Sequence, residues 1–194
     1  MKNRAFSLLS VALLFFWISS CTSKKEHKDS TSVDLSLVGD SLAMLAQATL
    51  LKNVSEAIQA GGTVHAIDFC HTKAGFLTDS IGTATGYSIQ RITDKPRNPG
   101  NSLMAAETEL FSQIREDLLN QKAEPHYLLE DDMGGVVFYK PIVLGMPTCL
   151  KCHGQPGVDI DSATIEKLAE RYPNDAATGY SLGQLRGLWK IQKL

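Results

Sequence analysis

Residues 149–153 read CLKCH and place two thiols and one imidazole at a fixed spacing. This CxxCH spacing is the attachment signature of c-type haem. On one helical turn, Cys149 and Cys152 can both reach the vinyl groups on one edge of a porphyrin, while the adjacent histidine faces the iron. We therefore predict one covalent haem, held by Cys149 and Cys152, with His153 as an axial iron ligand. The motif occurs once, which argues against a multihaem protein.

Two cysteines at this spacing have three other common uses. A thioredoxin-like dithiol needs a βαβ context, which the sequence does not show. A zinc site needs four ligands, and no second CxxC or HxxxH segment completes one. A simple disulfide is the remaining alternative. The export predicted below leads to a compartment where haem is attached, and it favours haem over all three.

A second axial ligand has to come from elsewhere in the chain. Gly61 and Gly62 predict a helix stop, and a second helix is expected over 63–81. Cys70 lies on the apolar face of that helix, where it is as readily an inert buried thiol as a ligand. The other candidates for the second axial ligand are His65, His71, His126 and the five methionines. Of these, His71 is expected to face solvent.

Several blocks of residues, in a fixed order, resemble a known family. They lie at 66–70 (AIDFC), 91–101 (RITDKPRNPGN), 139–142 followed by 149–154, 172–180 and 186–187. The sequence is similar to the c-type haem domains with a PAS-like fold that occur in periplasmic sensor regions of bacterial histidine kinases and as stand-alone exported proteins. Asp94 and Leu103 depart from the family pattern.

The resemblance implies a six-coordinate iron, with the motif histidine on one side and a cysteine thiolate on the other. Transferred to this sequence, those ligands are His153 and Cys70. A thiolate is a strong anionic donor that stabilises ferric iron, so we expect a low reduction potential. Both axial positions are then filled, and the sequence contains no Ser-His-Asp set, phosphate loop or HExxH segment. We therefore do not expect an enzyme.

Basic residues gather around the proline-rich loop at 93–101. Arg91, Lys95 and Arg97 lie there, and an arginine fork suits a carboxylate. Arg91 and Arg97 are therefore candidate partners of the haem propionates. The alternative is an ordinary solvated basic loop.

The first twenty residues have the layout of a secretory signal peptide. Lys2 and Arg4 precede an apolar run over 8–18, which is too short to span a bilayer permanently. The run ends in ISSC, which resembles a bacterial lipobox and predicts that Cys21 is lipidated. Residues 21–34 contain almost nothing that could enter a core, so they predict a tether. We expect export and a lipid anchor in a bacterial membrane.

Residues 35–194 are expected to form one α+β domain with a PAS-like antiparallel sheet and N-terminal helices. Apolar periodicity predicts the helices, and alternation predicts the strands. The expected helices cover 38–58, 63–81, 104–122 and 162–171, and the expected strands cover 87–93, 127–130, 136–143 and 188–191. Helices come first and paired strands later, which favours α+β over a parallel α/β sheet.

The composition restricts the partners. A net charge of −2 argues against nucleic acid, which requires a basic surface. A redox or small-gas sensing haem domain is the function we expect, working with a separate kinase chain. A membrane-anchored, low-potential electron carrier with a redox partner protein is the alternative.

Overall fold

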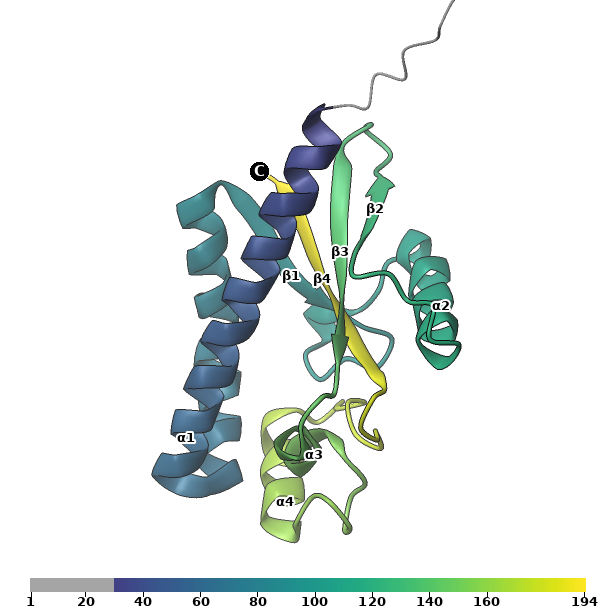
Figure 1. Cartoon of the computed structure of the whole chain (residues 1–194). Coiled ribbons are helices and arrows are strands. Elements are labelled where there is room, and N and C mark those ends of the chain that lie inside the picture. The colour runs from purple at the N-terminus through teal and green to yellow at the C-terminus, as the bar shows by residue number, and fades with distance from the viewer. Residues whose placement is uncertain (1–29) are drawn as a thin grey trace, which may run out of the picture.

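The computed structural model describes residues 30–194, with side chains from residue 35 onward. It confirms the α+β class: a four-stranded antiparallel sheet lies between helices (Figure 1). The elements follow the chain as α1 (Ser30–Thr85), β1 (Tyr87–Ile92), the short 3₁₀ helix η1 (Pro99–Asn101), α2 (Ala105–Leu119), β2 (Tyr127–Glu130), β3 (Val136–Val143), α3 (Pro147–His153), α4 (Ser162–Arg171) and β4 (Leu185–Lys193).

The sheet has the strand order β1-β4-β3-β2, so the last strand lies in the middle. β4 pairs antiparallel with β1 on one side, where Arg91 faces Trp189, and with β3 on the other. β2 and β3 form the predicted hairpin around residues 131–135. β4 is longer than the predicted 188–191, because both of its neighbours continue to supply backbone partners beyond those residues.

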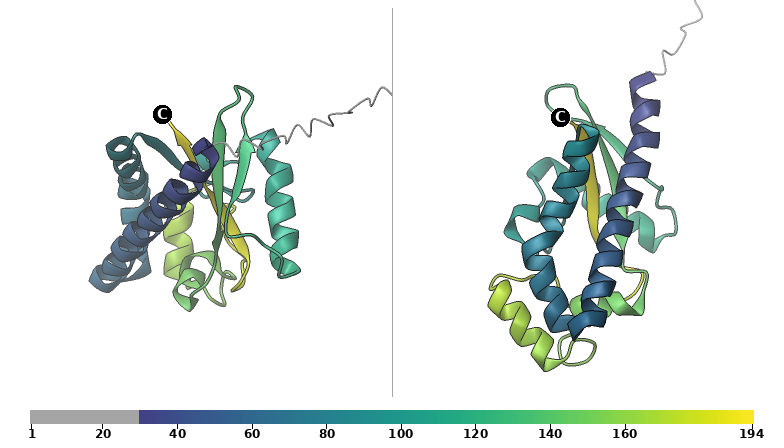
Figure 2. Two further views of the ribbon diagram at one scale, coloured as in Figure 1. Left: turned by 45° about the horizontal axis from the view of Figure 1, so that its top comes forward. Right: turned by 90° about the vertical axis from the view of Figure 1, so that its left-hand side faces the viewer.

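The α1 element consists of two helices, as predicted, joined by a sharp bend at Gly61 and Gly62. Gly62 has φ 74° and ψ −170°, a conformation that is essentially restricted to glycine. The first helix begins at Ser30, inside the segment that we predicted to be a tether, so the helix starts earlier than expected. The second helix runs back beside the first one (Figure 2).

Each face of the sheet has its own hydrophobic core. The α1 face contains Ile89, Phe138 and Ile191 packed against the helices of α1, and the opposite face packs against α2 (Figure 2). Gly39 allows α1 to approach the sheet closely, because a Cβ there would lie 2.5 Å from the Phe138 ring. The alternation of buried side chains along β4 therefore fixes which helices cover which face.

The α2 face also contains a buried ion pair. Lys190 Nζ lies 2.7 Å from Glu107 Oε1, and both side chains are almost fully buried. The Tyr139 hydroxyl donates to the same carboxylate at 3.3 Å. Glu107 Oε2 accepts from the Met104 backbone N–H at the start of α2, so the carboxylate is fully engaged.

The short helices α3 and α4 form a lobe below the end of β3 (Figure 1). Ile67 on α1 packs there against Ile160 and Leu168, and Arg171 on α4 donates to Asp68 on α1. This lobe joins the CxxCH segment to the second helix of α1. Within residues 30–194, every helix falls short of the length and apolarity that crossing a membrane requires.

Candidate functional site

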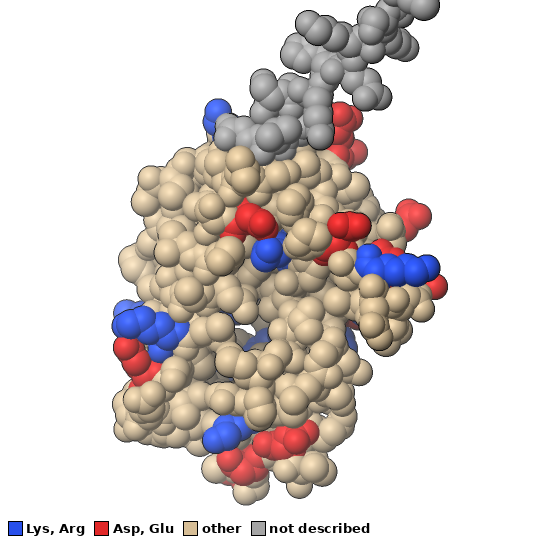
Figure 3. Space-filling view, viewed as in Figure 1, with Lys and Arg blue, Asp and Glu red and all other residues tan. Residues whose placement is uncertain are grey.

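A cavity lies where α1, the sheet and the α3–α4 lobe meet. Its interior measures about 220 Å³, and it opens to solvent on one side. Figure 3 shows the hollow in the face that carries α1, with basic side chains visible at its depth. Apolar side chains from both helices of α1 and from β3 form most of one wall: Leu50, Leu51, Val54, Ile58, Ala66, Ile67, Ile142, Val143 and Leu144.

The CxxCH residues lie on α3, which begins at Pro147 and ends at His153. Pro147 is suited to this first turn because its fixed φ matches the helix and its missing N–H has no helical partner to lose. Cys149, Cys152 and His153 all line the cavity. The two cysteines are free thiols, and burial raises the pKa of Cys152 to about 11. The structure therefore does not place them in a disulfide.

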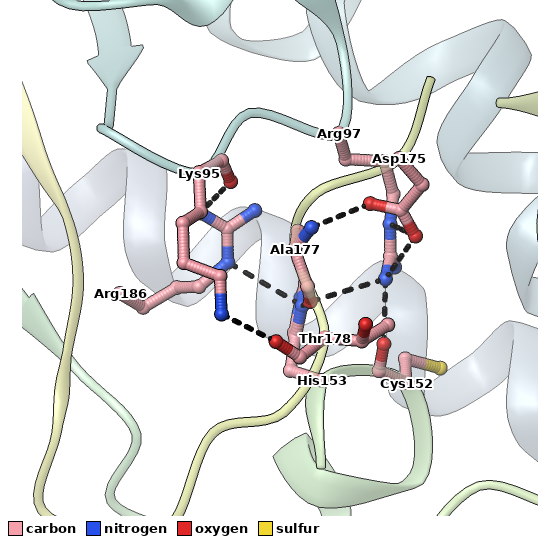
Figure 4. A network of polar contacts seen from close by, with 8 residues as sticks. All are labelled: Lys95, Arg97, Cys152, His153, Asp175, Ala177, Thr178 and Arg186. Carbon is pink, nitrogen blue, oxygen red and sulfur yellow. Dashed lines mark hydrogen bonds and ion pairs between the residues drawn. The ribbon is translucent and has the colours of Figure 1, made fainter. Parts of the chain in front are cut away.

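The His153 ring is fixed by the loop that follows α4. Its Nδ1 lies 2.7 Å from the backbone carbonyl oxygen of Ala177 (Figure 4). A carbonyl can only accept, so Nδ1 carries the proton and Nε2 keeps its lone pair. Arg186 Nε lies 3.3 Å from the same nitrogen and therefore packs against it without donating. Burial, then the charges of Arg97 and Arg186, hold the pKa of His153 well below its usual range.

Arg97 connects α3 to the 175–178 loop. Its Nη2 donates to the Cys152 carbonyl at 2.6 Å, and its Nε donates to Asp175 Oδ2 at 3.0 Å (Figure 4). A longer contact of 3.4 Å joins Nη2 to the Ala177 carbonyl. Arg97 lines the cavity as expected, but Asp175 already balances its charge. Its role toward a propionate stays a prediction.

Arg91 and Arg186 also line the cavity, and neither has a carboxylate partner among the residues that the structure describes. The Arg91 guanidinium lies 6.0 Å from the centre of the Trp189 ring. Arg186 donates to the Thr93 hydroxyl at 3.2 Å, and burial lowers its pKa to about 10. Arg186 was not among the site residues predicted from the sequence, although it lies in the 186–187 block of the resemblance.

Cys70 is the candidate second ligand that the structure brings to this cavity. It projects from α1, half-buried, while Cys152 and His153 come from α3. His65 and His71 are exposed, and the His71 ring packs edge-on against Tyr172. His126 lies instead beside Asp40 and Phe138, outside the cavity lining. No methionine lines the cavity within residues 30–194.

The charge state of Cys70 depends on its neighbours. Burial raises the pKa of its thiol, and the positive charges of Arg91 and then Arg97 oppose that shift. A metal cation bound in the cavity beside Cys70 would favour the thiolate in the same way. Tyr172 and Trp189 line the cavity as well as packing in the core.

The donor set suits a planar, dianionic, iron-containing group better than the alternatives. Two thiols and an imidazole with a free Nε2 lie on one short helix, a third thiol lies on another wall, and two cations lack carboxylate partners. Across 30–194, no group of three or more metal-binding side chains gathers as a zinc site would require. All three strand pairings are antiparallel, which does not match a thioredoxin-like βαβ unit.

One predicted site residue, Cys21, lies outside the described residues, as do the signal peptide and the first part of the tether. The structure therefore does not address the lipid anchor.

Two of the three comparisons with known proteins found a match. No curated protein matches this sequence. The fold is similar to that in the crystal structure of the cyanobacterial haem-protein Tll0287, with a TM-score of 0.56 and 22% sequence identity, over 77% of this chain and 91% of that chain. The Tll0287-like family model matches residues 24–193, almost the whole chain. The chain therefore belongs to the Tll0287-like family.

Proposed function

We propose that this protein carries one c-type haem in the cavity between α1, the sheet and α3, bound through thioether bonds from Cys149 and Cys152. The observation that carries the proposal is the convergence of these two thiols, His153 and Cys70 on one apolar cavity with a basic edge. The family resemblance and the similarity to a haem protein support it.

His153 and Cys70 are the proposed axial ligands of the iron. The Ala177 carbonyl holds the His153 proton on Nδ1, which leaves Nε2 available as a ligand. When bound, the haem supplies one-electron and ligand-binding chemistry, while the protein sets its potential. Cys70 contributes negative charge, which stabilises the ferric state and lowers the reduction potential.

Arg91 and Arg186 are the proposed partners of the haem propionates. Each propionate is an anion, and burying it stably requires a cation or several hydrogen-bond donors. Both arginines reach the cavity without a carboxylate partner among the described residues, so their charges are available. Arg97 contributes mainly by holding the helix that carries His153.

The proposed physiological role is redox or small-gas sensing by a PAS-like domain. Cys70 lies on the second helix of α1, which the bend at Gly61 and Gly62 joins to the first helix. If an external donor supplied one electron to the haem and solvent supplied a proton, the Cys70 thiolate would become a neutral thiol, which is a much weaker ligand. Release of Cys70 would free its helix to shift, and the bend would transmit that shift toward the N-terminal end.

Export and a lipid anchor on Cys21 complete the proposal, on the grounds of the sequence alone. Anchoring would place the first helix of α1 between the membrane and the haem site. A separate kinase or another membrane protein is the proposed receiver of the signal. A low-potential electron carrier would use the same haem without release of Cys70.

The covalent haem is tested by expressing the full chain with a c-type cytochrome maturation system. We expect one haem per chain that remains attached after denaturation, detected by haem staining and intact mass. Cys149→Ser combined with Cys152→Ser should abolish the attachment, whereas Cys70→Ser should retain it. Colourless protein, or colour lost on denaturation, would contradict the proposal.

Carbon monoxide separates the sensor from the carrier. If Cys70 releases on reduction, the ferrous protein should bind carbon monoxide and change its absorption spectrum. An unchanged six-coordinate ferrous spectrum that does not respond to carbon monoxide would exclude the sensing mechanism and favour the carrier.

A further inference from the structure

The first helix of α1 exposes a regular series of large and small side chains. Leu37, Met44 and Leu51 are exposed, with 70%, 63% and 39% of their surfaces accessible. They recur every seven residues, and small residues lie between them. In order, the series is Leu37, Ser41, Met44, Ala48, Leu51, Ser55 and Ile58, the last of which is half-buried.

We propose that this face, the α1 seam, is the contact between two copies of this chain in a parallel dimer. The spacing of four and three residues is that of the inner positions of a coiled coil. A straight surface helix packed on its own sheet needs no such repeat on its solvent side. Over residues 37–48 the repeat on the exposed side is therefore unexplained by the single chain, whereas Leu51 and Ile58 also line the cavity.

The α1 seam is complementary to itself. Large residues occupy one inner position of each heptad, and small residues occupy the other. When two such helices pair around a twofold axis, each large side chain can enter the space beside a small one. The same surface thus supplies both knobs and holes, which selects a second copy over an unrelated partner.

Both serine hydroxyls on the seam have a hydrogen-bond partner within the helix. The Ser41 hydroxyl donates to the Leu37 carbonyl at 2.9 Å, and Ser55 accepts from the Gln59 side chain at 3.3 Å. Covering Ser41 therefore leaves its hydroxyl donor paired, so for this residue the usual cost of burying a hydroxyl is avoided.

Charge is absent from the seam. Asp40, the one charged residue over 35–51, lies beside the seam, where it pairs with Lys140 at 2.7 Å. The next charged pair, Lys52 and Glu56, lies beyond it. Two copies can therefore meet here without repulsion between like charges.

The orientation follows from where the rest of the chain joins the helix. Residues 1–29 precede Ser30, and the proposed lipid anchor at Cys21 lies in that segment. Two anchored copies enter their helices from the same membrane, so their N-terminal ends lie together in a parallel pair. This step rests on the proposed anchor, whereas the contact itself does not depend on it or on haem.

The α1 seam also reaches the cavity. Leu51 and Ile58, at its C-terminal end, are lining residues of the cavity. A partner helix on the seam would therefore touch side chains that also contact the cavity's contents. A change in the contents of the cavity could therefore alter the contact between the two copies directly.

Cysteine cross-linking of the full chain in isolated membranes tests the arrangement. Ser41→Cys and Ser55→Cys should each form a disulfide with the same position in the second copy under mild oxidation. Ser112→Cys, on the exposed side of α2, is the matched control and should remain uncross-linked. Cross-linking only when the first two variants are mixed would overturn the parallel arrangement.

Sedimentation of the detergent-purified, haem-loaded chain tests the contact. The wild type should sediment as a dimer, and Leu37→Glu or Met44→Glu should raise the dissociation constant by about tenfold or more. Leu119→Glu, at an equally exposed leucine on α2, should leave the dimer intact. Unchanged far-UV circular dichroism and haem content would show that each variant is folded.

Two results would overturn the proposal while leaving the haem assignment untouched. One is a wild-type protein that sediments with the mass of a monomer at all micromolar protein concentrations. The other is a monomer whose binding to anionic lipid vesicles is lost in Leu37→Glu, which would assign the face to the membrane surface.

Discussion

The Nδ1 atom of His153 lies 2.7 Å from the carbonyl oxygen of Ala177, a residue 24 positions further along the chain. The contact fixes which ring nitrogen carries the proton, and so which one is free to bind iron. Arg97 holds both sides of this contact, because it donates to the carbonyl of Cys152 and to Asp175 in the loop of Ala177. The geometry of the histidine therefore depends on a residue from a distant loop.

Replacing Arg97 tests this arrangement. The Arg97 and Asp175 side chains are only 14% and 10% exposed. Arg97→Ala leaves Asp175 buried without its cation, and breaking such a pair costs about 3–5 kcal/mol. We expect the free energy of unfolding of the haem-loaded chain to fall by this amount in guanidinium titrations followed by far-UV circular dichroism.

Arg115→Ala is the matched control for Arg97→Ala. Arg115 pairs with Asp94 at the surface, where the two side chains are 47% and 32% exposed. We expect a loss of at most about 1 kcal/mol, because water screens an exposed pair. Equal losses in the two variants would show that Arg97 does not connect α3 to the 175–178 loop.

The bend in α1 gives a second prediction. Gly62 has a backbone conformation that side-chain-bearing residues avoid, so Gly62→Ala should destabilise the fold by about 1–3 kcal/mol. Gly75 lies inside the second helix with open space around it, so Gly75→Ala should stabilise the fold by about 0.5–1 kcal/mol. Thermal unfolding of both variants checks the opposite signs. A neutral or stabilising Gly62→Ala would mean that the bend does not have this conformation.

Local patterns predicted most of the secondary structure. The break at Gly61–Gly62, the β2–β3 hairpin and the helix over 162–171 are all determined by residues close to one another in sequence. The CxxCH motif likewise specifies its own chemistry, since its donors lie on one helical turn. Such features do not depend on how the distant parts of the chain pack.

Contacts between distant segments could not be predicted in the same way. Arg186 reaches the cavity because β4 lies beside β1, and nothing near Arg186 in the sequence indicates that pairing. Ala177 contributes a backbone carbonyl, which any residue could supply. The early start of α1 at Ser30 was also missed, because its polar residues suggest a tether when read alone.

The cap of α4 makes stability depend on pH. Asp161 Oδ1 accepts from the Thr164 backbone N–H at 2.8 Å, and this hydrogen bond lowers the pKa of Asp161. A lowered carboxyl pKa stabilises the fold fully above the ordinary value of about 3.9, and the stabilisation is lost as the pH falls through the lowered pKa. Asp161→Ala should therefore be destabilising at neutral pH and less so in acid.

Asp161→Asn provides the control for this pH dependence. Asparagine keeps the capping oxygen but has no titrating carboxyl group. Urea titrations at neutral and at acidic pH should show that Asp161→Asn keeps the cap at both. The advantage of wild type over Asp161→Asn should be greater at neutral pH, where the carboxylate is charged, than in acid. A stability difference between wild type and Asp161→Ala that does not vary with pH would refute the role of the carboxylate.

Ferric electron paramagnetic resonance and absorption spectra of wild type, Cys70→Ala and His71→Ala test the central claim most directly. These neighbouring residues differ in placement, because Cys70 lines the cavity and His71 is exposed. The account predicts a low-spin thiolate signature in wild type and His71→Ala that is absent from Cys70→Ala. A Cys70→Ala spectrum identical to that of wild type would contradict it.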